Sequence, residues 1–396
     1  MIEFVIIFGL MGGLLVYVLI QAQRTMPYVY CVAKISAWEA RMIPESRLFE
    51  FVDAAKVSNV LTGLDDTSYR THLSNVPRGE EIDVVAVERA LKEHLREDFG
   101  ELIDAIPKER KEVIIKFIKR ADLYNLKTLV TAIHNRVPKE KRREEMLPSP
   151  TLPQERLGLL ASAETPEDLL KYLEGTEYFG AFSAALKRYK DRGLQVLLSA
   201  LDKAYYSSLW EEVVGRRERL PVWKRIRGLK AALERREQRQ VLKKIIGYEI
   251  DAVNIKLVLR LKKEGALFED IESMLILPSY ELSESTLTWM ATAKDIRTAV
   301  EGISHTTYGP ILAKALPEAE ASGSLVSLEK ALDEGWLKVC KWMSVAKFFS
   351  LAPVLSYIRL KEMEARNLRT IIRLKADKIE PKKIKEVIVR VPKFEL

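Results

Sequence analysis

The chain of 396 residues is long enough for two or three domains of the usual size, about 100–200 residues each. Hydrophobic residues make up 47% and charged residues 30%, which excludes a disordered chain, and the low counts of glycine (18) and proline (16) argue against a turn-rich β-sandwich or barrel. The net charge of +8 suits an acidic protein partner or an anionic membrane surface, and it permits nucleic acid.

The first segment, residues 2–20, is apolar apart from Glu3. A helix of this length spans about 28 Å, close to the hydrocarbon thickness of a bilayer. Because no basic region or small-residue cleavage site accompanies it, we expect an uncleaved membrane anchor. Arg24 and the basic body follow the segment, which predicts that the body lies in the cytoplasm. The alternatives are a translation start at Met26 and an apolar arm buried in protein.

Beyond residue 26, apolar residues recur at spacings of three and four, which predicts helices almost throughout and an all-α fold. The clearest periodic runs are 82–103, 108–135, 196–214, 240–263 and 326–346.

An internal repeat organises this helical body. Residues 160–186 align without a gap with 290–316, and 51–69 align with 160–178. Each of the three copies has a small residue, followed by a threonine and a tyrosine two residues apart. We expect the threonine to cap the next helix and the tyrosine to pack with its hydroxyl outward. The residues are Ala54, Thr67 and Tyr69; Ala163, Thr176 and Tyr178; and Ala293, Thr306 and Tyr308.

A second marker alternates with the first: an acid, an asparagine three residues later, an apolar residue and a basic residue. The copies are Asp122-Asn125-Leu126-Lys127, Asp251-Asn254-Ile255-Lys256 and Glu364-Asn367-Leu368-Arg369. The acid and the asparagine share a helix face with apolar residues, so we expect them to be buried and to need hydrogen-bond partners. An internal clamp between helices is the favoured interpretation, and a contact surface for another protein is the alternative.

Two independent markers that alternate three times predict three similar helical units. We place the apolar segment at 1–26 and the units at 27–145, 146–275 and 276–396.

Motifs for catalysis and cofactor binding are missing from the sequence. It contains no phosphate-binding loop, no dinucleotide-binding glycine pattern and no Gly-x-Ser-x-Gly elbow. No two histidines have a helical ligand spacing, and the two cysteines are too few for a disulfide framework. We therefore expect no catalytic residue, metal, cofactor or small-molecule substrate. The histidines are His72, His94, His134 and His305, and the cysteines are Cys31 and Cys340.

Residues 216–244 form the strongest charge feature, with a net charge of +9. Ile226, Leu229 and Leu233 add an apolar stripe, which predicts an amphipathic helix with a basic face. A solvated face is the first interpretation, docking to an acidic partner or anionic head groups the second, and nucleic-acid binding the third. The basic residues that could face a partner are Arg216, Arg217, Arg219, Lys224, Arg225, Arg227, Arg235, Arg236 and Arg239.

The two markers, together with the opening Tyr28-Val29-Tyr30, Ala33 and Trp38-Glu39-Ala40, resemble the C subunit of archaeal-type (A/V-type) rotary ATP synthases, known as the d subunit in the vacuolar proton pump. The resemblance covers about residues 27–390. It implies three similar helical domains arranged as a funnel, which sits on the cytoplasmic face of a proteolipid ring and receives the central stalk in its cavity. It also implies a rotor component that couples these parts and catalyses nothing.

The apolar N-terminus departs from the soluble members of that family. We predict that residues 2–20 contact lipid in the hole of the ring and anchor the funnel to the cell membrane. The alternative function is a membrane-anchored helical scaffold that binds nucleic acid through residues 216–244.

Overall fold

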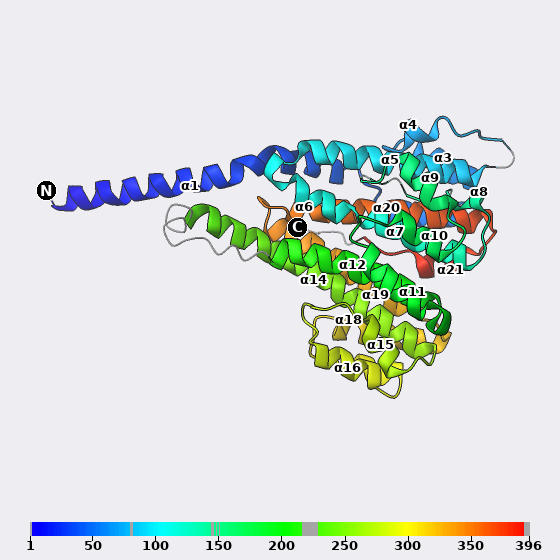
Figure 1. The fold of residues 1–396 in the computed structure, drawn as a ribbon. Coiled ribbons are helices and arrows are strands. Elements are labelled where there is room, and N and C mark those ends of the chain that lie inside the picture. The colour runs from blue at the N-terminus through cyan, green and yellow to red at the C-terminus, as the bar shows by residue number, and fades with distance from the viewer. Residues whose placement is uncertain are drawn as a thin grey trace.

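The computed structural model of the chain describes residues 2–79, 82–143, 146, 147, 149, 151–215 and 229–391. Within these ranges every regular element is a helix, which confirms the all-α prediction (Figure 1). The side chains of some helical residues also lie outside the description: 2–9, 20, 21, 23, 24, 27, 109, 154, 214, 215 and 229–235.

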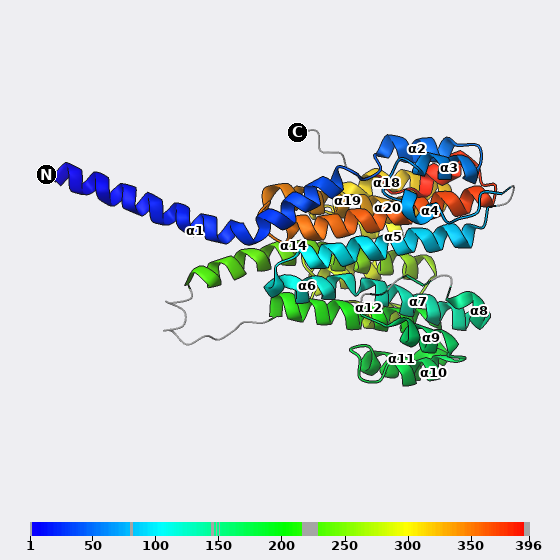
Figure 2. The same ribbon diagram turned by 90° about the horizontal axis from the view of Figure 1, so that it is seen from above.

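The first helix, α1 (Ile2–Glu39), continues without a break past residue 26. Its N-terminal half projects away from the body (Figures 1 and 2), and the eight large apolar side chains between Leu10 and Leu19 are 52–70% exposed. An arm buried within this chain is therefore wrong for residues 10–19. Among the described side chains, no helix offers a stretch both long and apolar enough to cross a bilayer. The second half of α1 packs into the core through Tyr28, Cys31, Val32 and Ile35.

After α1, one order of helices occurs three times: two short helices, a helix that follows the marker tyrosine, two long helices and a short closing helix. Between the two long helices the first copy has an additional helix, α6, and the second has the short π-helix η1. The first copy comprises α2 (Glu45–Asp53), α3 (Val57–Leu64), α4 (Arg70–Leu73), α5 (Val84–Ala105), α6 (Lys108–Ile118), α7 (Arg120–His134) and α8 (Lys139–Arg142). The second comprises α9 (Gln154–Ser162), α10 (Pro166–Tyr172), α11 (Phe179–Arg192), α12 (Leu194–Trp210), η1 (Glu211–Gly215), α14 (Leu229–Lys263) and α15 (Phe268–Met274). The third comprises α16 (Glu284–Thr292), α17 (Ile296–Glu301), α18 (Gly309–Ser322), α19 (Val326–Ala346), α20 (Ala352–Ala376) and α21 (Pro381–Val387).

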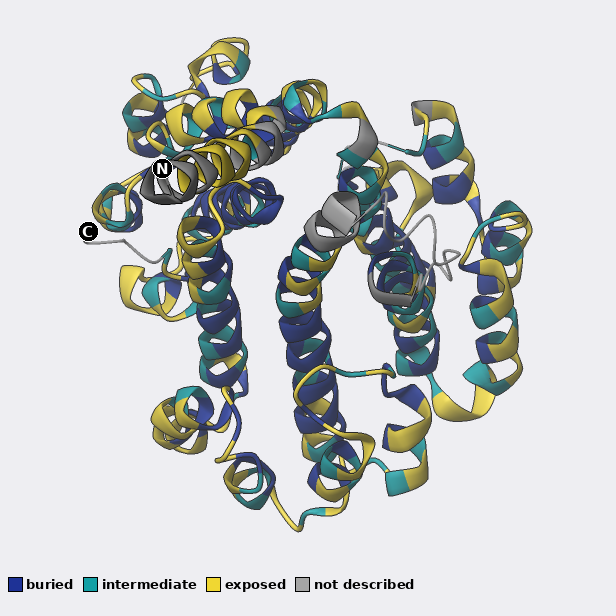
Figure 3. Cartoon of the chain, turned by 90° about the vertical axis from the view of Figure 1, so that its left-hand side faces the viewer, coloured by how far each residue is buried: buried dark blue, intermediate teal, exposed yellow. Residues whose placement is uncertain are grey.

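The long helices of the three copies pack in a closed ring. The helix with the acid–asparagine marker in one copy packs against a long helix of the next copy, so α7 contacts α12, α14 contacts α19, and α20 returns to α5. Figure 2 shows α20 and α5 side by side although they come from opposite ends of the chain. In Figure 3 the long helices are buried along much of their length, whereas the short helices around them carry many of the exposed residues.

The marker asparagines make the same hydrogen bonds in all three copies. Each side-chain amide accepts from the backbone N–H and donates to the backbone carbonyl of a residue 22 positions further along the chain. These bonds satisfy the backbone N–H and carbonyl groups of a residue that lies outside the helices and so lacks helical hydrogen bonds. The pairs are Asn125 with Leu147, Asn254 with Ile276 and Asn367 with Val389. The unit boundaries at 145/146 and 275/276 remain a prediction.

The marker tyrosines point inward, so the expectation of outward hydroxyls is wrong. The hydroxyl of Tyr308 donates to Asp251 and that of Tyr69 donates to Glu364, both at 2.8 Å. The Tyr178 hydroxyl is buried and has no hydrogen-bond partner among the described residues, and Asp122 accepts from two nearby hydroxyl groups instead. A carboxylate buried in the marker helix needs a donor, and this requirement draws the tyrosine inward.

The marker threonines do not cap the next helix. Each hydroxyl donates to the carbonyl three residues earlier and so closes the preceding helical turn, at 2.6–2.7 Å. The shared alanines accept hydrogen bonds through their carbonyl groups at the ends of α2, α9 and α16. In each case the donor is a cation from the preceding copy in the ring: Lys375 for Ala54, Arg142 for Ala163 and Lys262 for Ala293.

Candidate functional site

A cavity of about 920 Å³ lies between the long helices of the three copies, lined by α5, α7, α12, α14 and α20 with α15. The basic residue of each acid–asparagine marker lines this cavity: Lys127, Lys256 and Arg369. The sequence markers therefore identify the helix face that surrounds the cavity, although their spacing alone does not predict a cavity.

Equivalent positions of the three marker helices form the wall. They are spaced by one, three or four residues, so they make a stripe along each helix. The sets are Tyr124, Val253 and Arg366; Lys127, Lys256 and Arg369; Thr128, Leu257 and Thr370; and Thr131, Arg260 and Arg373.

Ion pairs connect the copies at the wall of the cavity. Lys127 lies 2.6 Å from Asp202, and Lys256 lies 2.6 Å from Asp333. The third pair joins Arg369 to Glu88 at 3.6 Å, across the contact between the last copy and the first. Each pair therefore ties a marker helix to the long helix that packs against it.

A partly buried arginine joins all three copies. Arg120 of α7 contacts Glu249 of α14 at 2.6 Å and Glu362 of α20 at 2.9 Å. These three residues occupy the same position of the repeat, two residues before the marker acid. The guanidinium also lies over the rings of Phe117 and Trp336, at 4.6 and 4.9 Å from their centroids. Burial alone would lower the pKa of Arg120, but the two carboxylates raise it, so the group stays charged.

The cavity lining carries an excess of positive charge. Ten basic and three acidic side chains line it. Asp333 lies behind the wall within 4 Å of three of the basic groups: Lys256, Arg359 and Arg366. Burial raises the pKa of Asp333, but these charges outweigh burial and bring its pKa down to about 2.

The basic stretch 216–244 is described only from Leu229, where α14 begins. Arg216, Arg217, Arg219, Lys224, Arg225 and Arg227 lie outside the described residues, as does the side chain of Arg235. Arg236 is exposed and Arg239 is partly buried, and neither lines the cavity. The start of α14 projects in the same direction as the arm of α1 (Figures 1 and 2).

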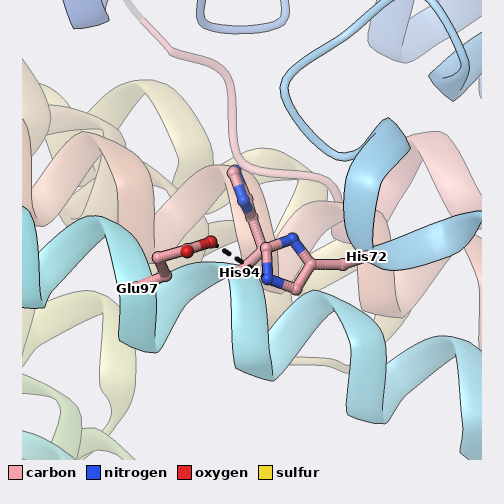
Figure 4. A group of neighbouring side chains, drawn as sticks. All are labelled: His72, His94 and Glu97. Carbon is pink, nitrogen blue, oxygen red and sulfur yellow. Dashed lines mark ion pairs between the residues drawn. The ribbon is translucent and has the colours of Figure 1, made fainter.

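Two histidines that are far apart in sequence are neighbours in the fold. The ring centroids of His72 on α4 and His94 on α5 are 5.2 Å apart, and Glu97 lies beside them (Figure 4). Spacing along one helix could not reveal this pair, because its members come from different helices. The two cysteines are buried thiols, and burial raises the pKa of Cys31 to about 11 and that of Cys340 to about 12.

Comparison with known proteins gives consistent matches. The sequence profile of the family described as ATP synthase (C/AC39) subunit matches residues 31–387. The C subunit of the A-type ATP synthase of Methanocaldococcus jannaschii is 29% identical over 364 residues, 92% of this chain and 86% of the relative. The protein of the same name from Pyrococcus abyssi is 29% identical, covering 91% of this chain and 90% of the relative.

A third relative extends the match toward the N-terminus. The C subunit of the A-type ATP synthase of Methanosphaera stadtmanae is 26% identical over 97% of this chain and 94% of its own length. Only 3% of the 396 residues, about 12, then stay unmatched, so the alignment enters the segment 1–26. The names of these relatives give the nucleic-acid alternative no support.

The charge environment of Asp333 predicts how stability depends on pH. Because its folded pKa lies below the usual aspartate value of about 4, Asp333 stabilises the protein above that pH and loses this contribution as the pH falls toward 2. We expect the difference in unfolding free energy between wild type and Asp333→Asn to shrink by about 2 kcal/mol between pH 5 and pH 2. Urea unfolding at several pH values measures this difference. A difference that does not change with pH would contradict the assigned pairing.

Proposed function

Because the chain belongs to the ATP synthase (C/AC39) subunit family, we propose that it is a non-catalytic rotor subunit of an archaeal-type ATP synthase. It couples the central stalk to the membrane proteolipid ring and transmits torque between ATP synthesis or hydrolysis and ion translocation. The observation that carries this proposal is the family match over residues 31–387, taken together with a cavity whose wall comes from all three copies.

The cavity is the proposed seat of the stalk. Its volume of about 920 Å³ accommodates only the tip of a partner, and its basic lining favours a tip that presents carboxylates. A seat that transmits torque must resist deformation, and close-packed helical cores deform little. The contacts of Arg120 join the three marker helices, and the ion pairs between copies cross each contact between a marker helix and the long helix of the next copy, so both add to this resistance.

The N-terminal arm is the proposed membrane anchor, which holds the body on the cytoplasmic face of the cell membrane. Its exposed apolar side chains between Leu10 and Leu19 have no partner surface within the described part of the chain, and lipid would cover them. A part that rotates cannot be tied to a stationary helix outside the ring. The lipid-filled hole of the ring is therefore the mechanically consistent place for residues 2–20.

Co-purification tests the proposed function. A tagged full-length chain should bring down a proteolipid ring and stalk subunits. Removal of this chain from the complex should uncouple ATP hydrolysis from ion flow without abolishing hydrolysis.

We expect Arg366→Glu, which places a negative charge on the cavity wall, to weaken stalk binding at least tenfold while ring binding persists. Arg41→Glu is the matched control, since Arg41 is exposed and does not line the cavity.

Two outcomes would count against this assignment. Complexes that stay fully coupled without the chain would refute its role in coupling. Equal loss of stalk binding in Arg366→Glu and Arg41→Glu would refute the cavity as the seat of the stalk.

Membrane extraction tests the proposed anchor. A full-length chain should resist carbonate extraction, whereas a chain that starts at Met26 should be released, because the apolar segment 2–20 is the part held in lipid. The extraction is carried out on membranes that lack the other subunits, so that binding to the ring does not mask the difference. Equal release of both chains would show that residues 2–20 do not anchor the protein in the membrane.

A further inference from the structure

Three side chains that can bind metal converge on one side of α5. His94 and Glu97 are three residues apart on α5, so they project from one face of the helix, and His72 approaches them from α4 (Figure 4). The Nε2 atom of His72 lies 3.1 Å from an Oε atom of Glu97. One potential ligand atom from each residue lies within 4.8 Å of the other two.

From this arrangement we propose that His72, His94 and Glu97 bind one divalent transition-metal ion of the zinc type. Two imidazoles and one carboxylate form a ligand set that zinc accepts, with a fourth position left for water. Ligand atoms around tetrahedral zinc lie about 3.3 Å apart, so the pair from His72 and Glu97 already has the required separation. His94 supplies the third ligand, with one ring nitrogen within 4.8 Å of the other two ligand atoms.

The surroundings of His94 support a bound ion. The ring of His94 is held in place from behind, because its Nε2 atom lies 3.1 Å from the Ser68 hydroxyl and 3.4 Å from a carboxylate oxygen of Asp98. Carboxylates behind metal-binding imidazoles orient the ring in this way.

The local charge also favours a cation. Asp98 and Glu364 share the buried ammonium of Lys361, which lies 3.2 Å from the first and 2.8 Å from the second. Two carboxylates and one ammonium leave a formal charge of −1, and Glu97 adds another negative charge. A divalent ion balances this negative charge.

The site lies beside the contact that closes the ring of helices. The ring of His94 is 4.2 Å from that of Tyr69, whose hydroxyl donates to Glu364 on α20. A metal ion that fixes α4 against α5 therefore also holds Tyr69 at the contact between the first copy and the third. The role of the metal ion is structural, and this proposal is independent of the proposed function in the rotor.

Metal titration of the purified full-length chain tests the proposal. Equilibrium dialysis against Zn²⁺ should give one ion per chain, and Co²⁺ should give the visible absorption of a four-coordinate site with nitrogen and oxygen ligands. We expect His72→Gln and Glu97→Gln each to weaken Zn²⁺ binding at least tenfold. Zn²⁺ should raise the thermal unfolding midpoint of the wild type, because it binds the folded state, and should leave that of His72→Gln unchanged.

His305→Gln is the matched control, because His305 is exposed and lies outside the group. It should bind Zn²⁺ as the wild type does. His72 and Glu97 are both at least partly exposed, so their variants are expected to fold, and circular dichroism verifies this. Wild type that binds no Zn²⁺, or binds it no more tightly than folded His72→Gln, would overturn the proposal.

Discussion

The fold depends on one partly buried arginine where the three copies meet. Arg120 contacts Glu249 and Glu362, which occupy its own position in the other two copies. A strict repeat would place three like charges together in a medium of low dielectric constant, and their repulsion would separate the copies. The repeat must therefore diverge at this position, and one cation between two carboxylates turns a potential repulsion into an attachment.

Further polar contacts join the copies at positions farther from Arg120. Lys127, Lys256 and Arg369 tie each marker helix to the next copy along the cavity wall, and cations at the ends of the helices bond to the shared alanines at the periphery. Because every marker helix contacts a neighbouring copy, no copy can move without breaking polar contacts between copies. A closed body of this kind suits a part that must pass torque from a stalk to a ring.

Much of this architecture could be predicted from the sequence, because local periodicity determines helices. The run 326–346 coincides with α19, whereas the run 108–135 is interrupted at Lys119, where α6 gives way to α7. The markers correctly indicated buried polar groups, but their partners could not be read from spacing. Asn254 bonds to Ile276 in a segment without helical periodicity.

Other features depend on contacts between distant segments, which periodicity does not record. Tyr69 and Tyr308 point inward because carboxylates from other helices need their hydroxyl groups. A repeat search finds similar residues, so it does not find Arg120, whose counterparts carry the opposite charge. Helical spacing cannot pair His72 with His94, because different helices bring them together.

A double-mutant cycle on Arg120 and its two carboxylates is the most direct test of the attachment between the three copies. Urea unfolding of wild type, Arg120→Gln, the double variant Glu249→Gln/Glu362→Gln and the triple variant gives the coupling energy between the arginine and the two carboxylates. We predict that Arg120→Gln alone costs about 3–5 kcal/mol, because the buried carboxylate of Glu249 loses its cation, whereas Glu362 keeps Arg359 at 3.2 Å, and that the triple variant recovers a large part of this loss. Additive effects, with no coupling between the arginine and the carboxylates, would contradict it.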